Sequence, residues 1–219
     1  MKNSLKNLLI FALFLSFFSF CTAQTVSKME AKALDVQKWV TTHFGHGQLP
    51  PFSFKYGERN SSEFIRKWDY SLKKLAGSEP HQQKYLVTYH DPQSGLRINC
   101  DIAAYSDYGT VEWVLHFLNE SEQNTPAISK LRTTNIIFQY PQKGIFRLHY
   151  ANGSNAGRTD FAPKLKQLFP GDSLYMRPYG GRSSSYSAFP FFNIESPANQ
   201  GVLAAIGWTG TWFSNIRCV

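Results

Sequence analysis

The stretch from residue 85 to residue 117 constrains the fold most, because apolar and polar side chains alternate along it. One apolar set, at every second position, comprises Leu96, Ile98, Cys100, Ile102 and Ala104. A period of two places such residues on one face of a β-strand and their polar neighbours on the other. Turn residues at 90–95 and 106–109 divide the stretch into three segments. The sequence therefore predicts an antiparallel meander, buried on one face, with strands at 85–89, 96–105 and 111–117.

The other apolar runs are also short and bounded by turn residues, which favours β-strands. Strands are expected at 52–56, 131–138 and 145–150, while residues 61–75 fit either a short helix or an irregular strand. Residues 27–44 carry a helical stripe, which predicts a leader helix closed by Gly45. Many short strands separated by turn signals, without an internal repeat, predict a single all-β domain, a β-sandwich of two packed antiparallel sheets.

The N-terminus has the pattern of an export signal. A positively charged start precedes an apolar segment at 8–20, and small residues lead up to Ala23. Cleavage after Ala23 would give an exported chain, periplasmic or extracellular. A lipoprotein acylated at Cys21 ranks second, because the bulky Phe20 precedes that cysteine. The predicted layout is a signal peptide at 1–23, a helical leader at 24–48, a β-sandwich domain at 49–212 and a divergent tail at 213–219.

The charge of the chain argues against a nucleic-acid partner. The formal net charge is +8, and removal of Lys2 and Lys6 with the signal takes it to +6. The remaining basic residues are scattered, without a run of five and without a nucleic-acid-binding motif. We expect no nucleic-acid partner and no membrane partner beyond export.

Metal and thiol chemistry have little support in the sequence. His43 and His46 have a spacing found in metal sites, yet no third ligand is near them. After signal cleavage Cys100 and Cys218 remain. Cys100 lies on an apolar strand face, which indicates a buried thiol, and a disulfide between the two cysteines stays open. We therefore expect no metal and no cofactor.

The segment 180–212 carries the strongest indication of a binding site. A loop rich in glycine and serine, with Arg182, leads into a strand, a turn and a second strand that ends in Trp208 and Trp212. Paired runs bounded by Gly, Pro and Asn predict a hairpin, and polar loops beside aromatic residues often line ligand sites. The alternative is a plain sheet edge with a solvated connection.

A second polar loop, at 151–160, holds the best polar cluster: Asn155, Arg158 and Asp160. Glycosidases act with two carboxylates roughly 5 to 9.5 Å apart. Most Asp and Glu residues of this chain fall in turns or on solvent-facing strand positions, and none forms a recognisable pair. Nucleophile elbows and phosphate loops are also absent from the sequence. We therefore assign no catalytic residue.

Several short motifs occur in a fixed order between residues 49 and 212. They are PFSFKYG (51–57), TYHDPQSGL (88–96), VEWVL (111–115), GSN (153–155), GGRS (180–183), PFFN (190–193) and AIGWTG (205–210). In this order they resemble the N-terminal region of secreted α-galactosidases of the melibiase type, glycoside hydrolase family 36. The resemblance implies a β-supersandwich packed on a (β/α)₈ barrel, in which two aspartates act with retention and without a metal.

The resemblance implies a galactoside-type carbohydrate as the partner. It also allows a homo-oligomer in the full-length enzyme. The candidate carbohydrate or inter-domain contacts are Asn155, Arg158, Asp160, Arg182, Trp208 and Trp212, with core packing as the alternative for both tryptophans. A barrel needs about 200 further residues, and the chain stops at Val219, so we expect a truncated or frameshifted product. The expected function is a non-catalytic N-terminal domain of an α-galactosidase-like hydrolase. The alternatives are an independent carbohydrate-binding module and a scaffold domain.

Overall fold

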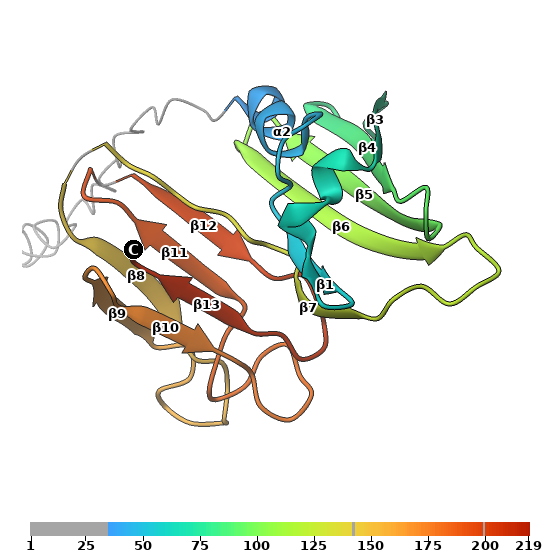
Figure 1. Ribbon diagram of the computed structural model, residues 1–219. Coiled ribbons are helices and arrows are strands. Elements are labelled where there is room, and N and C mark those ends of the chain that lie inside the picture. Colours follow the sequence, from blue (N-terminus) through green and yellow to red (C-terminus); the bar gives the residue numbers. More distant parts are fainter. Residues whose placement is uncertain (1–34, 142, 199) are drawn as a thin grey trace, which may run out of the picture. The chain divides into compact units, whose positions relative to one another are not determined.

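The computed structural model describes residues 35–141, 143–198 and 200–219 (Figure 1). Their strands pair antiparallel and form four sheets. This confirms the predicted all-β, sandwich-type fold, although the strands divide among four sheets rather than two. The expected signal peptide, the alternative acylation at Cys21 and most of the leader lie outside the described residues. Among the helices that are described, none is long and apolar enough to cross a membrane.

The predicted three-stranded meander, joined by one further strand, β3, is the largest unit of the first half of the chain. Its four strands follow the chain order: β3 (Asp69–Leu75), β4 (Gln82–His90), β5 (Leu96–Tyr105) and β6 (Thr110–Asn119). Cys100 on β5 lies opposite Val87 on β4 and Leu115 on β6, so all three side chains share the buried face. The alternation read from the sequence therefore fixes the register, because a slip by one residue would expose the apolar set.

A smaller sheet and a helix cover this buried face. The sheet comprises β1 (Ser53–Tyr56), β2 (Arg59–Asn60) and β7 (Ile128–Arg132), and the helix is α2 (Val36–Phe44). Asp35 caps the helix by accepting a hydrogen bond from Lys38 N at 2.9 Å. The hydroxyl of Tyr70 donates to Phe44 O at 2.8 Å and ties the end of the helix to β3. Residues 61–75 are in part 3₁₀-helix, η1 (Ser61–Glu63) and η2 (Ile65–Lys67), and in part strand β3.

The prediction of a strand at 131–138 was wrong, because the strand β7 begins earlier and ends at Arg132. Beyond it the backbone groups have other partners. The carbonyl of Thr133 accepts from the indole of Trp113 at 2.8 Å, and Asn135 N donates to Pro51 O at 2.7 Å. Since these groups are used outside a ladder, the strand cannot continue through them.

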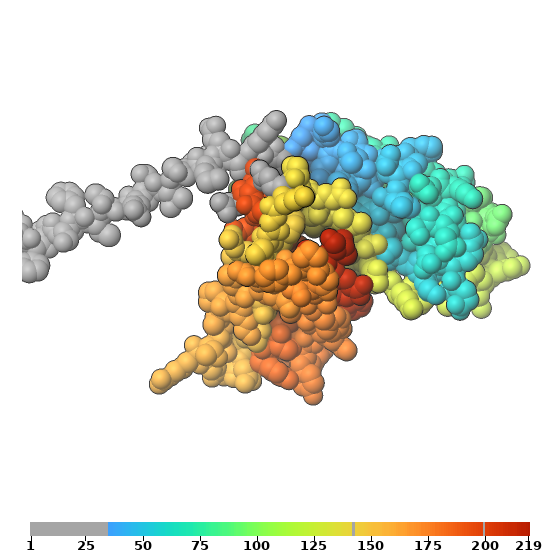
Figure 2. Space-filling model, turned by 60° about the vertical axis from the view of Figure 1, so that its left-hand side comes forward, coloured from blue at the N-terminus to red at the C-terminus, as the bar shows by residue number. Residues whose placement is uncertain are grey.

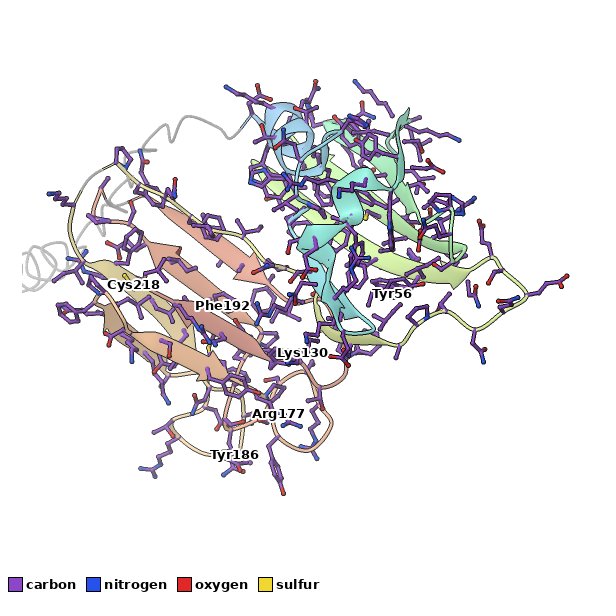
Figure 3. All side chains as sticks on the ribbon, in the orientation of Figure 1. Tyr56, Lys130, Arg177, Tyr186, Phe192 and Cys218 are labelled. Atoms are coloured by element: carbon purple, nitrogen blue, oxygen red, sulfur yellow. The ribbon has the colours of Figure 1, made fainter. Side chains whose placement is uncertain are left out.

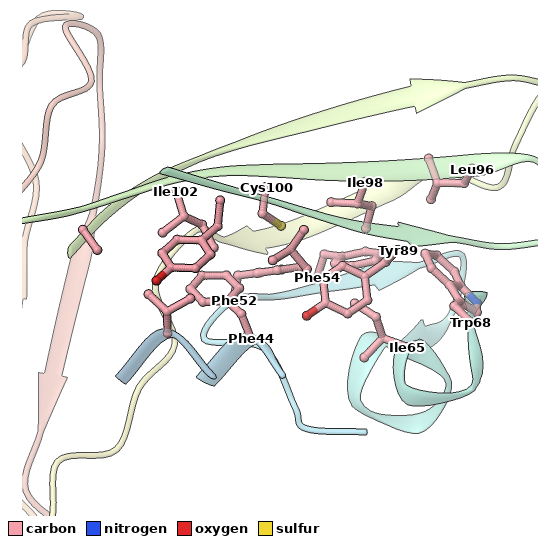
Figure 4. Close-up of a cluster of buried hydrophobic side chains, with 14 of the residues drawn as sticks. Phe44, Phe52, Phe54, Ile65, Trp68, Tyr89, Leu96, Ile98, Cys100 and Ile102 are labelled. Carbon is pink, nitrogen blue, oxygen red and sulfur yellow. The ribbon is translucent and has the colours of Figure 1, made fainter. Parts of the chain in front are cut away.

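Aromatic rings dominate the interior between these elements, which we call the first core (Figure 4). Its fully buried members include Phe44, Ile65, Leu96, Ile98, Val40, Val87 and Cys100. Cys100 is a free thiol whose pKa burial raises far above its usual value, and Cys218 is also free. The expectation of a buried thiol at Cys100 is confirmed, and the open question of a disulfide is answered by two unpaired cysteines.

The second half of the chain forms two further sheets. One has the order β12 (Gly201–Ala205), β11 (Phe191–Glu195), β8 (Phe146–Ala151), β9 (Pro163–Leu168). The other pairs β10 (Ser173–Met176) with β13 (Ser214–Arg217), so strand structure extends into the predicted tail. Their shared interior, which we call the second core, contains Leu148, Leu168, Met176, Ala188, Phe192 and Trp212.

The predicted hairpin is confirmed as β11 and β12, which pair from Phe191–Ala205 to Glu195–Gly201. Its second strand is shorter than expected. The strand β12 stops at Ala205, and Ile206 N then donates to Pro190 O. Trp208 and Trp212 therefore lie beyond the end of the strand. Glycines at 207 and 210 follow, and glycine is a poor strand residue.

Candidate functional site

An open hollow of about 440 Å³ lies in the loop between β10 and β11. Eight residues line it: Arg177, Pro178, Tyr179, Gly180, Gly181, Tyr186, Ser187 and Thr211. Tyr179 is 69% exposed and Tyr186 is 51% exposed, and their ring centroids are 5.9 Å apart at an interplanar angle of 46°. Figure 3 labels Arg177 and Tyr186, which lie on the loop that follows β10. The hollow thus offers two aromatic faces and one cation to solvent.

Two glycines are among the residues that line the hollow. Gly180 has φ +76° and Gly181 has φ +71°, both in the left-handed region that other residues rarely adopt. After them in the chain, Ser185 Oγ accepts from Tyr179 N at 2.8 Å and lies 2.9 Å from Ser187 Oγ. The hydroxyl of Ser187 donates in turn to Arg177 O at 2.8 Å. These hydrogen bonds join the two sides of the loop, so they hold the main chain that carries the two tyrosines.

Two outside contacts anchor this loop. The indole of Trp212 donates to Ser183 O at 2.7 Å, and Gly153 N donates to Ser185 O at 2.7 Å. A Cβ at Gly153 would lie 2.8 Å from that carbonyl oxygen and 2.9 Å from Ser185 N, so the approach requires glycine. The second polar loop therefore supports the first one through Gly153. Figure 2 shows these segments, gold and orange, at the molecular surface.

The predicted cluster at Asn155, Arg158 and Asp160 is partly assembled. The carboxylate of Asp160 accepts from Ser154 Oγ at 2.6 Å, Asn155 N at 2.9 Å and Gly157 N at 3.1 Å. The hydrogen bond from Ser154, followed by that from Asn155 N, lowers the pKa of Asp160 below its usual value. Asp160 thus closes its own loop, while the side chains of Asn155 and Arg158 are exposed on it.

The other predicted residues differ in their surroundings. Arg182 is exposed and directly follows Gly181. Trp208 is 66% exposed, and its indole covers Gly210, where an added Cβ would lie 2.6 Å from Trp208 Nε1. Trp212 is only 7% exposed and packs in the second core. The structure therefore places Trp208 at the surface and gives Trp212 the contacts of an anchor.

None of the six predicted contact residues is among the eight that line the hollow. The sequence patterns did not indicate Arg177, Tyr179 and Tyr186, although they pointed to the Gly180–Gly181 loop between these residues. A signal was present, since Tyr179 precedes the glycine pair and Tyr186 follows the serine run. What the sequence could not show is that the chain folds back to bring the two rings within 5.9 Å. The role of the six residues in contacts stays a prediction.

A charged cluster lies on the face of β8 and β11 that points away from the second core. Glu195 Oε1 is 2.8 Å from Arg147 Nη1, and Glu195 Oε2 is 2.5 Å from His149 Nε2. The hydrogen bond with His149, and then that with Arg147, holds the pKa of Glu195 below its usual value. One carboxylate held between two basic groups is a cross-strand ion pair, which stabilises the sheet.

We expect the contribution of Glu195 to stability to depend on pH. A folded pKa below the unfolded value of about 4.3 means that the contribution is present above that value and lost as pH falls through the folded pKa. Thermal unfolding of the wild type and Glu195→Gln should therefore differ in Tm at pH 7 and converge at low pH. The exposed Glu122→Gln is the matched control. A difference for Glu195→Gln that does not change with pH would contradict this role.

Comparisons with known proteins agree with the fold. The sequence matches no protein-family model and no curated protein. Among solved structures, it is similar to the GH36 alpha-galactosidase AgaA from Geobacillus stearothermophilus, with TM-score 0.53, 13% identity, and coverage of 78% of this chain and 25% of that chain. Two AgaA variants, in complex with raffinose and with stachyose, give TM-scores of 0.51 and 0.50 at 12% identity. The chain thus spans about a quarter of AgaA and shares the fold of that part.

Proposed function

We propose that this chain is a non-catalytic, carbohydrate-binding β-sandwich domain of an α-galactosidase-like hydrolase, in which a separate barrel performs retaining hydrolysis with two aspartates. The observation that carries the proposal is the structural alignment, in which most of this chain matches a quarter of AgaA. The order of the sequence motifs along residues 49–212 supports the same relationship.

The hollow supplies chemistry that suits a sugar. Faces of Tyr179 and Tyr186 can pack against the C–H groups of a pyranose ring, while Ser187, Thr211 and Arg177 can bond its hydroxyls. The eight lining residues include no carboxylate, so the hollow itself lacks the acid and nucleophile of a glycosidase. Its residues therefore favour binding without turnover.

Replacement of either tyrosine should weaken sugar binding. We expect Tyr179→Ala and Tyr186→Ala each to raise the Kd for raffinose about tenfold, or 1.4 kcal/mol, because each removes one stacking face. Isothermal titration calorimetry of the purified chain gives this number. Tyr108→Ala, an exposed tyrosine in the turn between β5 and β6, is the matched control and should bind like the wild type. Equal losses for all three variants, or none for any, would contradict the assignment of the hollow.

An independent carbohydrate-binding module is the second candidate, because the whole lining comes from one short segment and Thr211. The properties of the sheet face that points away from the second core distinguish this candidate from the attached domain. Leu165, Phe191 and Leu203 are exposed there, as expected for a face that packs on another domain. If sedimentation shows that the chain associates at high concentration and that Leu203→Lys suppresses this association, the result would favour a domain that packs on a second domain. A monomer at all concentrations would favour the independent module.

A further inference from the structure

The hollow carries an uncompensated positive charge. Apart from its tyrosines, Arg177 is its only ionisable lining residue. Arg97 and Arg147 each have a carboxylate oxygen at 2.8 Å, whereas no carboxylate among the described residues lies within 4.0 Å of the Arg177 guanidinium. The main chain of Arg177 is fixed, because Ser187 Oγ donates to its carbonyl at 2.8 Å. A fixed backbone thus presents a free cation beside Tyr179 and Tyr186.

Gly180 and Gly181 add backbone N–H groups to the lining of the hollow. The N–H groups of Gly180 and Gly181 donate to no other group in the described part of the chain. Successive N–H groups in a tight turn form a favourable environment for an anion. Arg182, exposed directly after the glycine pair, adds a second positive charge at the rim. The cation and the backbone donors therefore line one hollow, and no acidic side chain is among its lining residues.

A guanidinium binds a carboxylate or a sulfate through two parallel hydrogen bonds, which are stronger than bonds to neutral hydroxyls. We propose that the hollow selects sugars that carry an anionic substituent, with Arg177 bound to that substituent and the rings of Tyr179 and Tyr186 against the pyranose. The inference rests on the proposed function, namely that the hollow binds a sugar at all. Galacturonic acid, which differs from galactose by a carboxylate at C6, represents this ligand class.

The test is calorimetry of the purified chain with galacturonic acid and with galactose at low salt. We expect galacturonic acid to bind at least about tenfold more tightly, and we expect Arg177→Gln to abolish this preference by weakening the binding of galacturonic acid far more than the binding of galactose. Arg177→Lys should keep part of the preference, because it retains the charge but loses the planar fork. Arg66→Gln, an exposed arginine outside the hollow, is the matched control and should behave like the wild type.

Four results would overturn the inference, and they are distinguishable. Equal affinity for both sugars, or a preference that survives in Arg177→Gln, would refute the role of Arg177 and leave sugar binding in place. Inorganic sulfate that competes as well as galacturonic acid does would show a site for free anions instead of an acidic sugar. Failure of both sugars to bind would count against the proposed function itself.

Discussion

Trp212→Ala is expected to destabilise the protein by about 3–5 kcal/mol and to abolish sugar binding in the hollow. Trp212 is 7% exposed and packs in the second core with Leu148, Met176 and Phe192, so its removal leaves a large cavity. The same substitution frees Ser183 O from the indole hydrogen bond at 2.7 Å and releases the loop that carries the hollow. Urea denaturation followed by circular dichroism measures the first effect, and calorimetry with raffinose the second.

Two variants separate the parts of this effect. Trp212→Phe keeps most of the apolar volume but loses the N–H donor, so it should cost about 1–3 kcal/mol. Trp208→Ala should cost less than about 0.5 kcal/mol, because Trp208 lies mostly in solvent. A larger loss for Trp208→Ala than for Trp212→Ala would contradict the assignment of Trp212 as the anchor.

Phe54→Ala should have a comparable effect on the first core, with a loss of about 3–5 kcal/mol in the free energy of unfolding. Phe54 is 3% exposed and holds the small sheet against the meander. Its ring centroid lies near those of five aromatic neighbours: Phe117 at 5.6 Å, Phe64 at 6.0 Å, Trp68 at 6.4 Å, and Phe52 and Tyr56 at 6.5 Å each. Truncation removes all five contacts at once.

The same urea titration measures this loss. Phe161→Ala is the control, because that ring is half-exposed and its removal should cost about 1 kcal/mol or less. A loss of the same size for Phe161→Ala and Phe54→Ala would mean that the aromatic cluster does not stabilise the fold as described.

The meander could be predicted from the sequence because its strands are buried on one face only. The strand at 96–105 shows this best, since its alternation matches the observed bounds of β5. The strand at 131–138 could not be placed, because its end is set by contacts with Trp113 and Pro51, which are distant in sequence. Local patterns therefore predict ladders that face a core, and they fail where a strand end depends on a distant partner.

For the candidate site, too, the sequence predicted the loop but not which of its side chains are exposed. The sequence pointed to the glycine–serine loop because glycine pairs and serine runs have no place in a strand. For Trp212 the sequence left two interpretations open, a contact residue beside the polar loop and a core residue. Only the packing of the second core shows that its ring is buried and that Tyr179 and Tyr186 present the exposed faces.

Calorimetric titration of the purified chain with raffinose tests the central proposal most directly, because one trace reports both binding and hydrolysis. We predict saturable heats, a baseline that returns to its starting value after each injection, and intact raffinose at the end. Heat that continues between injections, together with free galactose, would show that the chain is catalytic. The absence of any binding heat would contradict its role as a carbohydrate-binding domain.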